Sequence, residues 1–163
     1  MTCGAAEPPG PDREADGAIL AVDYGLKRVG LAVCDPRRRT AVGVGSVQGL
    51  TGRTLARAVE KAALARQAAT IIIGETEQPL SEGLTKNPVR EGAERLSDAL
   101  ARAGFNVLRW NEANTTAAVL ADRRRLGGKG KPARRWADEA AAILILQDYL
   151  DYLALPTRDS PPR

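Results

Sequence analysis

Three acidic residues stand at positions where a fold can bring them together. Asp23 ends the apolar run AILAVD, Glu112 follows the run NVLRWN, and Asp138 precedes the apolar segment AAAILIL. Clustered carboxylates repel one another, and a divalent cation is the usual remedy. Two such ions can activate a water and stabilise the leaving oxygen of a phosphodiester. We therefore predict that Asp23, Glu112 and Asp138 are catalytic residues that hold one or two Mg²⁺ or Mn²⁺ ions in a nuclease.

Each acid also has an ordinary structural interpretation. Asp23 can be a turn residue that bonds its own backbone. Glu112 can be an acid that precedes a helix capped by Asn114. Asp138 can interact with the dipole at the start of the last helix. The segment after Asp138 is apolar on nearly every face, however, so this helix is expected to be buried, and an acid there needs a partner or a cation.

The composition narrows the chemistry. The chain has no histidine, which excludes Ser–His and Cys–His nucleophile systems and zinc sites with imidazole ligands. Its two cysteines, Cys3 and Cys34, suggest neither a disulfide framework nor a structural zinc centre. The first residues do not resemble a signal peptide, and no stretch resembles a membrane span. These features indicate a cytoplasmic protein whose hard metal is held by oxygen ligands.

Positive charge is concentrated in two segments. The net charge of +4 favours an anionic partner such as nucleic acid. We predict a phosphate-binding clamp in a glycine-rich loop that leads to Asp138, although a solvated surface loop is the plainer interpretation. A basic turn forms the second cluster, and Trp136 is either a base-stacking residue or a core anchor. The predicted nucleic-acid-binding residues are Arg123, Arg124, Arg125, Lys129, Lys131, Arg134 and Arg135 in the loop, and Arg37, Arg38 and Arg39 in the turn.

The elements that position these residues follow from apolar patterning. We expect a disordered leader over 1–17, a single domain over 18–155 and a tail over 156–163. A hairpin-led opening followed by alternating strands and helices predicts an α/β fold, with a mixed β-sheet flanked by α-helices. Asp23 and Glu112 would then lie at one edge of the sheet, where ligands gather. The expected strands are 18–23, 29–34, 41–47, 70–74 and 105–110, the helices 51–68, 88–103, 115–126 and 136–153, and the main loops 75–86 and 127–135.

Four segments in this order resemble the YqgF/RuvX family: VDYGLKRVGLAV, IIIGETEQPL, NEANTT and ADEAAAILILQDYL. Members are described as Holliday junction resolvases or pre-16S ribosomal RNA nucleases. The resemblance spans residues 18–153 and implies a ribonuclease-H-like fold. It also implies that three metal-holding acids fall on Asp23, Glu112 and Asp138. The hydroxyl residues of the family's second motif fall on Thr115 and Thr116, which either bond a phosphate or carboxylate or simply cap a helix.

Two motifs depart from the family pattern. The usual Asp-Glu-Arg reads Asn111-Glu112-Ala113, and the usual Gly-Leu-Pro reads Gly74-Glu75-Thr76. Glu75 is therefore either an auxiliary ligand or a loop charge.

The resemblance favours 5′-end processing of precursor 16S rRNA in ribosome biogenesis, with Holliday junction resolution of branched DNA in recombination and repair as the alternative. Two other classes stay open, namely an actin-like nucleotide-binding domain and a catalytically inactive nucleic-acid-binding module. A junction resolvase would be a homodimer, whereas an RNA-trimming enzyme can be a monomer.

Overall fold

The computed structural model describes residues 17–75, 86–111 and 131–154, and for 131–138 it describes the backbone alone. The described elements are β1 (Ala18–Tyr24), β2 (Arg28–Cys34), β3 (Ala41–Gln48), α1 (Gly52–Ala65), β4 (Ala68–Glu75), α2 (Pro88–Arg102), β5 (Asn106–Asn111) and α4 (Lys131–Ala154). None of the helices in these ranges is long and apolar enough to cross a membrane.

The strands form one mixed sheet in the order β3-β2-β1-β4-β5. β2 pairs antiparallel with both β1 and β3, whereas β4 pairs parallel with both β1 and β5. β1 is therefore the middle strand, and the short turn after it makes the hairpin that the sequence predicted. The predicted mixed sheet is confirmed.

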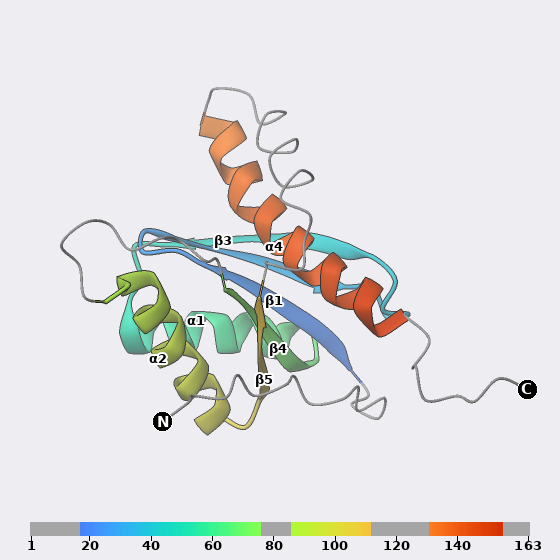
Figure 1. Ribbon diagram of the computed structural model, residues 1–163, viewed down its shortest axis with the longest axis horizontal. Coiled ribbons are helices and arrows are strands. Elements are labelled where there is room, and N and C mark those ends of the chain that lie inside the picture. Colours follow the sequence, from blue (N-terminus) through green and yellow to red (C-terminus); the bar gives the residue numbers. More distant parts are fainter. Residues whose placement is uncertain (1–16, 76–85, 112–130, 155–163) are drawn as a thin grey trace, which may run out of the picture.

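Helices cover both faces of the sheet, α1 and α2 on one and α4 on the other (Figure 1). Side chains alternate along β1 because successive Cβ atoms of a strand point to opposite faces. Leu20 and Val22 pack in the core beneath α1 and α2, whereas Ile19 and Ala21 pack beneath α4. Asp23 follows Val22, so its side chain lies on the α4 face.

Two element boundaries near β4 differ from the prediction. The helix expected over 51–68 ends at Ala65, and Ala68 already belongs to β4. The break lies at Gln67, whose φ of 54° is left-handed and cannot continue a helix. β4 also extends through Glu75, so Glu75 is a strand residue and not the first residue of a loop. Residues 76–85, the rest of that expected loop, lie outside the described ranges.

The last helix begins earlier than predicted. α4 starts at Lys131, not at 136, so Lys131, Arg134 and Arg135 are helical and do not belong to a loop. Pro132 is the second residue of this helix, and proline is well tolerated in the first turn, where its missing N–H has no helical partner to bond. Asp138 comes seven residues after Lys131 and is therefore not in the first turn, which holds no acid. The expected helix 115–126 falls outside the described residues.

Candidate active site

The carboxyl ends of β1, β4 and β5 lie at the same edge of the sheet, called here the carboxyl edge. Asp23 is paired with Gly74 of β4, and Gly74 is paired with Trp110 of β5. Asn111, the last residue of β5, is paired with Glu75. Glu112 comes next in the chain and lies outside the described residues, but the strand that precedes it ends at the edge where Asp23 lies.

Asp23 is half-buried and has glycines beside it on both neighbouring strands. Its register partners are Gly30 on β2 and Gly74 on β4. A methyl group at Gly74 would meet the Cδ1 atom of Ile145 and would lie 2.8 Å from its Cγ1 atom. α4 therefore packs directly on the backbone of β4, one strand away from Asp23, and glycine at 74 permits this close approach.

α4 runs antiparallel to β1, which directs its N-terminal part toward the carboxyl edge. Near the middle of the helix, Glu139 and Ile143 lie against Gly43 of β3. Further along, Gln147 accepts a hydrogen bond from the Ala41 N–H at 3.2 Å and donates one to the Arg39 carbonyl at 3.1 Å. Residues further along α4 thus contact residues nearer the start of β3, so the two elements run in opposite directions. Because β3 runs in the same direction as β1, α4 is antiparallel to β1 as well.

Position 138 belongs to this N-terminal part of α4. It precedes Ala142 by four residues and Ile145 by seven, which is the spacing of one helical stripe. Both of those side chains are buried against the sheet. Position 138 therefore comes one and two helical turns before residues that pack on the sheet, in the part of α4 that is directed toward the carboxyl edge.

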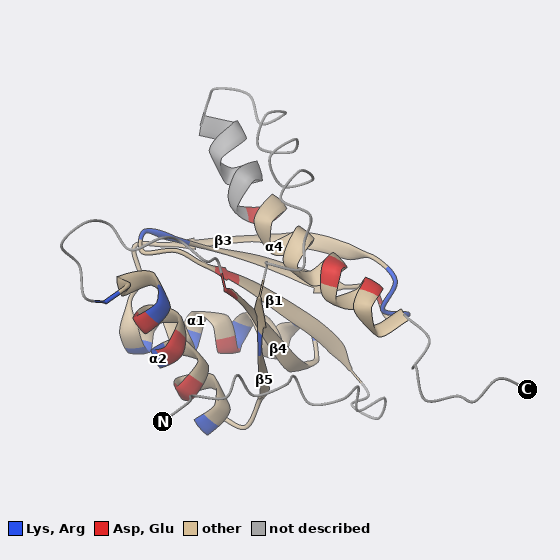
Figure 2. Cartoon of the chain, viewed as in Figure 1, with Lys and Arg blue, Asp and Glu red and all other residues tan. Residues whose placement is uncertain are grey.

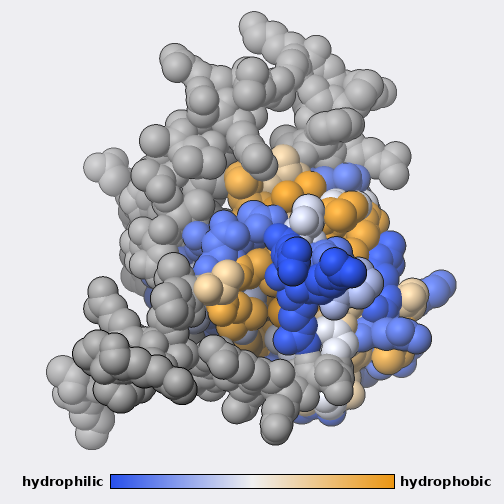
Figure 3. Space-filling model, turned by 90° about the vertical axis from the view of Figure 1, so that its right-hand side faces the viewer, coloured by the Kyte–Doolittle hydropathy of each residue, from blue (hydrophilic) through white to orange (hydrophobic). Residues whose placement is uncertain are grey.

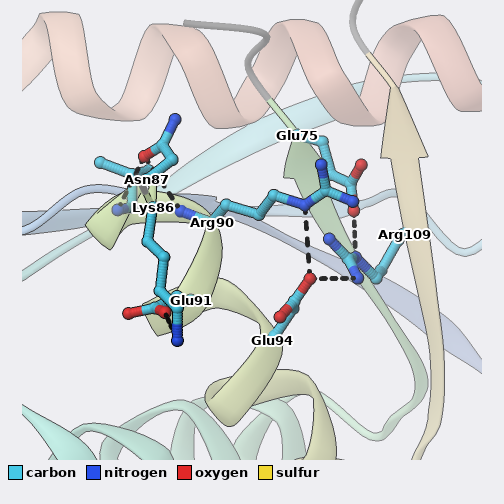
Figure 4. Close-up of polar contacts among 8 residues, drawn as sticks. Glu75, Lys86, Asn87, Arg90, Glu91, Glu94 and Arg109 are labelled. Atoms are coloured by element: carbon cyan, nitrogen blue, oxygen red, sulfur yellow. Dashed lines mark hydrogen bonds and ion pairs between the residues drawn. The ribbon is translucent and has the colours of Figure 1, made fainter. Parts of the chain in front are cut away.

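Glu75 lies at the same edge but on the opposite face of the sheet. Its side chain is paired with Arg109 of β5, and Arg109 also lies 3.3 Å from Glu94 of α2 (Figure 4). Arg90 contacts the same Glu94 oxygen at 3.3 Å. Glu75 thus belongs to an ion-pair network beneath α2, and the sheet separates it from the α4 face that Asp23 occupies. This placement speaks against Glu75 as an auxiliary ligand beside Asp23.

The basic turn of Arg37, Arg38 and Arg39 connects β2 to β3 and lies at the other edge of the sheet. Gly30 is level with Asp23, and five residues of extended chain from Gly30 to Asp35 span about 17 Å. Figure 2 shows the blue turn beside the C-terminal half of α4, which carries acidic residues. Seen from this end, strongly hydrophilic residues lie next to hydrophobic ones (Figure 3). The turn therefore cannot hold a phosphate at Asp23.

The conformation of this turn is fixed by Asp35 and Arg38. Asp35 accepts hydrogen bonds from the backbone N–H groups of Thr40, Arg39 and Arg37, and these bonds lower the pKa of its carboxyl below the ordinary value of 3.8. Arg38 donates from Nε and Nη2 to the Gly17 carbonyl, at 3.2 and 2.7 Å. Arg38 is thus a structural residue of the turn.

The other predicted site residues are only partly described. Thr115, Thr116, Arg123, Arg124, Arg125 and Lys129 fall outside the described ranges, and for Lys131, Arg134, Arg135 and Asp138 only helical backbone is given. The described side chains contain no group of three acids, cysteines or histidines that could hold a metal. Asp23 is the one predicted ligand whose side chain is described. The three carboxylates nevertheless fit Mg²⁺ or Mn²⁺, which prefer oxygen donors.

Four exposed residues at the carboxyl edge were missed by the sequence reasoning. Leu26 and Lys27 occupy the turn after β1, Leu50 lies between β3 and α1, and Arg53 is in the first turn of α1. The signal was available in the sequence. A turn that directly follows Asp23 in a hairpin must lie at the edge where Asp23 lies, and β3 must return to that edge.

Comparison with known proteins identifies one family, whose members carry two different names. The RuvX family, described as Holliday junction resolvase, matches residues 17–152. A protein of Nitrobacter winogradskyi named "Putative pre-16S rRNA nuclease" is 36% identical over 151 residues, which is 91% of this chain and 90% of that protein. A protein of the same name from Agathobacter rectalis is 36% identical over 141 residues, 83% of this chain and 96% of that protein.

Solved structures support the fold. Thermus thermophilus RuvC superimposes with a TM-score of 0.57 at 16% identity, covering 83% of this chain and 95% of that one. RuvC of the same organism in complex with a Holliday junction substrate gives 0.56 at 17% identity, covering 84% and 94%. At these identities the likeness shows the fold alone, and it confirms the expected ribonuclease-H-like class.

Proposed function

The chain belongs to the RuvX family, and we propose that it is a metal-dependent nuclease that cleaves phosphodiester bonds in structured nucleic acid. Its substrate in this proposal is precursor 16S rRNA, because the relatives at 36% identity carry that name, and cleavage at the 5′ end is what the family resemblance implies. The family description favours a second candidate, the Holliday junction. Both substrates are polyanions, in keeping with the net charge of +4.

The observation that carries the proposal is the position of Asp23. It lies at the carboxyl edge on the α4 face, and two other elements lead toward the same place. β5 ends at this edge immediately before Glu112, and α4 directs position 138 toward it. In mixed sheets of this kind, ligands bind outside the carboxyl ends of the strands.

The roles of the residues follow from this arrangement. Asp23, Glu112 and Asp138 would hold Mg²⁺ or Mn²⁺, which, when bound, supplies activation of a water and stabilises the leaving oxygen. Asp23 is held in place by strand pairing on both sides. Position 138 is on a helix anchored by Ile145 against Gly74. The basic residues between Arg123 and Arg135 would bind the phosphates that lead to this site.

Two substitutions on one edge of the sheet test the proposal. Single-stranded RNA carrying a 16S precursor end and a four-way DNA junction are incubated with Mg²⁺, Mn²⁺ or EDTA. We expect Asp23→Asn to lower metal-dependent cleavage by on the order of 100-fold or more, because the amide removes a charged ligand. Glu75→Gln is the matched control, since it changes the same chemical group on the other face and leaves cleavage close to wild type.

The outcomes separate the candidate functions. Cleavage of only one substrate identifies its class. Full activity of Asp23→Asn, or activity undiminished in EDTA, would refute the metal mechanism. Tight binding with no cleavage by the wild type would favour an inactive nucleic-acid-binding module and would make Asn111 and Ala113 the first positions to restore to the family pattern.

The proposal also covers the cellular compartment and the oligomeric state of the protein. We place the protein in the cytoplasm, because Cys34 is buried and free of any disulfide, as a thiol is in a reducing compartment. A monomer fits an RNA-trimming nuclease, and a homodimer fits junction resolution, since two strands must then be cut. Sedimentation with and without each substrate distinguishes the two.

A further inference from the structure

An exposed apolar pair lies at the carboxyl edge, close to Asp23. Leu26 is 53% exposed and Leu50 is 38% exposed, so two large aliphatic side chains face solvent in neighbouring segments. Their segments lie side by side, because Arg28 is paired with Gln48 and the Gly49 N–H donates to the Lys27 carbonyl at 3.4 Å. Leu26 follows Asp23 by three residues, so at most about 10 Å of chain separates them.

Cations accompany this pair. Lys27 and Arg53 are both exposed, and we call Leu26, Lys27, Leu50 and Arg53 the edge patch. Between Tyr24 and Val59 the chain contains a single acid, Asp35, and it lies at the opposite edge of the sheet. The β1–β2 turn is accordingly blue in Figure 2, at the end of the hairpin remote from the β2–β3 turn. The patch therefore combines apolar surface with positive charge.

We propose that the edge patch binds a single-stranded segment of nucleic acid next to the phosphate that is cleaved at Asp23. Lys27 and Arg53 contact phosphates, and Leu26 and Leu50 contact the face of an unpaired base. In a duplex the base faces are stacked on one another, so exposed aliphatic side chains gain contact area only where a strand is open or is pried open. This inference rests on the proposed nuclease function and adds which form of the substrate reaches the site.

Binding is measured separately from cleavage, so that the two proposals can fail independently. Fluorescence anisotropy in EDTA follows a labelled single-stranded RNA and a duplex of the same sequence. The test variants are Leu26→Ser/Leu50→Ser and Lys27→Gln/Arg53→Gln. The matched controls are Leu64→Ser and Lys61→Gln, because Leu64 is 62% exposed and both residues lie near the other end of α1.

For the leucine variant we expect single-strand affinity to fall about tenfold, with little change for the duplex. For the cation variant we expect the slope of log affinity against log salt to fall by about 0.7 for each phosphate that the protein no longer neutralises. The control variants should match the wild type for both nucleic acids.

Other results would overturn the inference. Unchanged binding by both test variants refutes the patch while leaving the nuclease proposal intact. Equal decreases in affinity for single strand and duplex refute the role of an unpaired base. Wild-type protein that binds neither nucleic acid contradicts both this inference and the proposed function. If Asp23→Asn loses cleavage but still binds single-stranded RNA through the edge patch, the result supports both the nuclease proposal and this inference.

Discussion

Replacing Gly74 by alanine tests whether the close approach of α4 to β4 positions the site. The new methyl would lie 2.8 Å from the Ile145 Cγ1 atom and 3.4 Å from Cγ2, and it would meet Cδ1 as well. Carbon atoms in contact prefer about 3.5–4.0 Å. Ile145 is 2% exposed, so it has no open space to move into. Either its side chain changes rotamer or α4 moves away from the sheet.

The expected cost of Gly74→Ala follows from overpacking, which destabilises by about 1–3 kcal/mol. A gain of about 0.4–1 kcal/mol from the stiffer unfolded chain offsets part of this. We therefore expect a net decrease of about 1–2 kcal/mol in the free energy of unfolding, measured by urea denaturation. Because α4 also carries Asp138, the variant should need a higher Mn²⁺ concentration for half-maximal cleavage than the wild type.

A double-mutant cycle provides the control. Ile145→Ala removes all three atoms that the methyl would meet and by itself costs about 2–5 kcal/mol through the cavity it leaves. In that background Gly74→Ala should cost little or should even stabilise, because the methyl fills part of the cavity. We expect a coupling energy of about 1–3 kcal/mol. Additive effects, within about 0.5 kcal/mol, would refute direct packing between these two residues.

Three further predictions concern the edge opposite to Asp23 and the contacts of α4. Arg38→Ala should lower the free energy of unfolding by about 0.5–1.5 kcal/mol, because the Arg38 guanidinium donates twice to a backbone carbonyl. Arg37→Ala should leave the free energy of unfolding close to that of the wild type. Equal melting temperatures of the two variants would contradict this prediction. Asp148→Ala should lower the free energy of unfolding, measured with urea, by about 1–3 kcal/mol, because it leaves the Trp110 indole N–H without the acceptor that lies 2.7 Å away. If the free energy of unfolding fell by less than about 0.3 kcal/mol, another acceptor would have to replace Asp148. Because the pKa of Asp35 is lowered from 3.8, its stabilising contribution is present above pH 3.8 and disappears as the pH falls through the folded-state pKa. The stability difference between wild type and Asp35→Ala should therefore shrink in acid, and a difference that grows as the pH falls would contradict the role given to its backbone hydrogen bonds.

The strands were predictable because their apolar runs are short, β-branched and bounded by turn residues. β1 and β4 illustrate this, since AILAVD and TIIIG mark both strands and the predicted ends lie within two residues of the structure. The position of Asp23 at a strand end was predictable for the same reason. Its face was not stated, because both faces of β1 are buried and the run is continuously apolar.

The start of α4 was predicted wrongly, whereas the location of the basic turn was not predicted at all. A proline in the interior of a helix breaks it, whereas a proline in the first turn does not. The sequence alone does not say which of these positions Pro132 occupies. The position of Arg37–Arg39, by contrast, could have been inferred. In a meander of three strands, successive turns fall on alternate edges, so the turn after β2 must lie opposite the one after β1.

The strand order has a consequence for how the protein folds. β1, β2 and β3 form a local meander whose partners are few residues apart, whereas Asp23 meets Gly74 only by closing a chain of about fifty residues. Loops of that length close at greater entropic cost than hairpins, so the parallel half of the sheet is expected to join after the meander has formed. α4, the last of the described elements, then packs across both halves. The carboxyl edge around Asp23 therefore begins to form with the hairpin but is complete only after β4, β5 and α4 have joined.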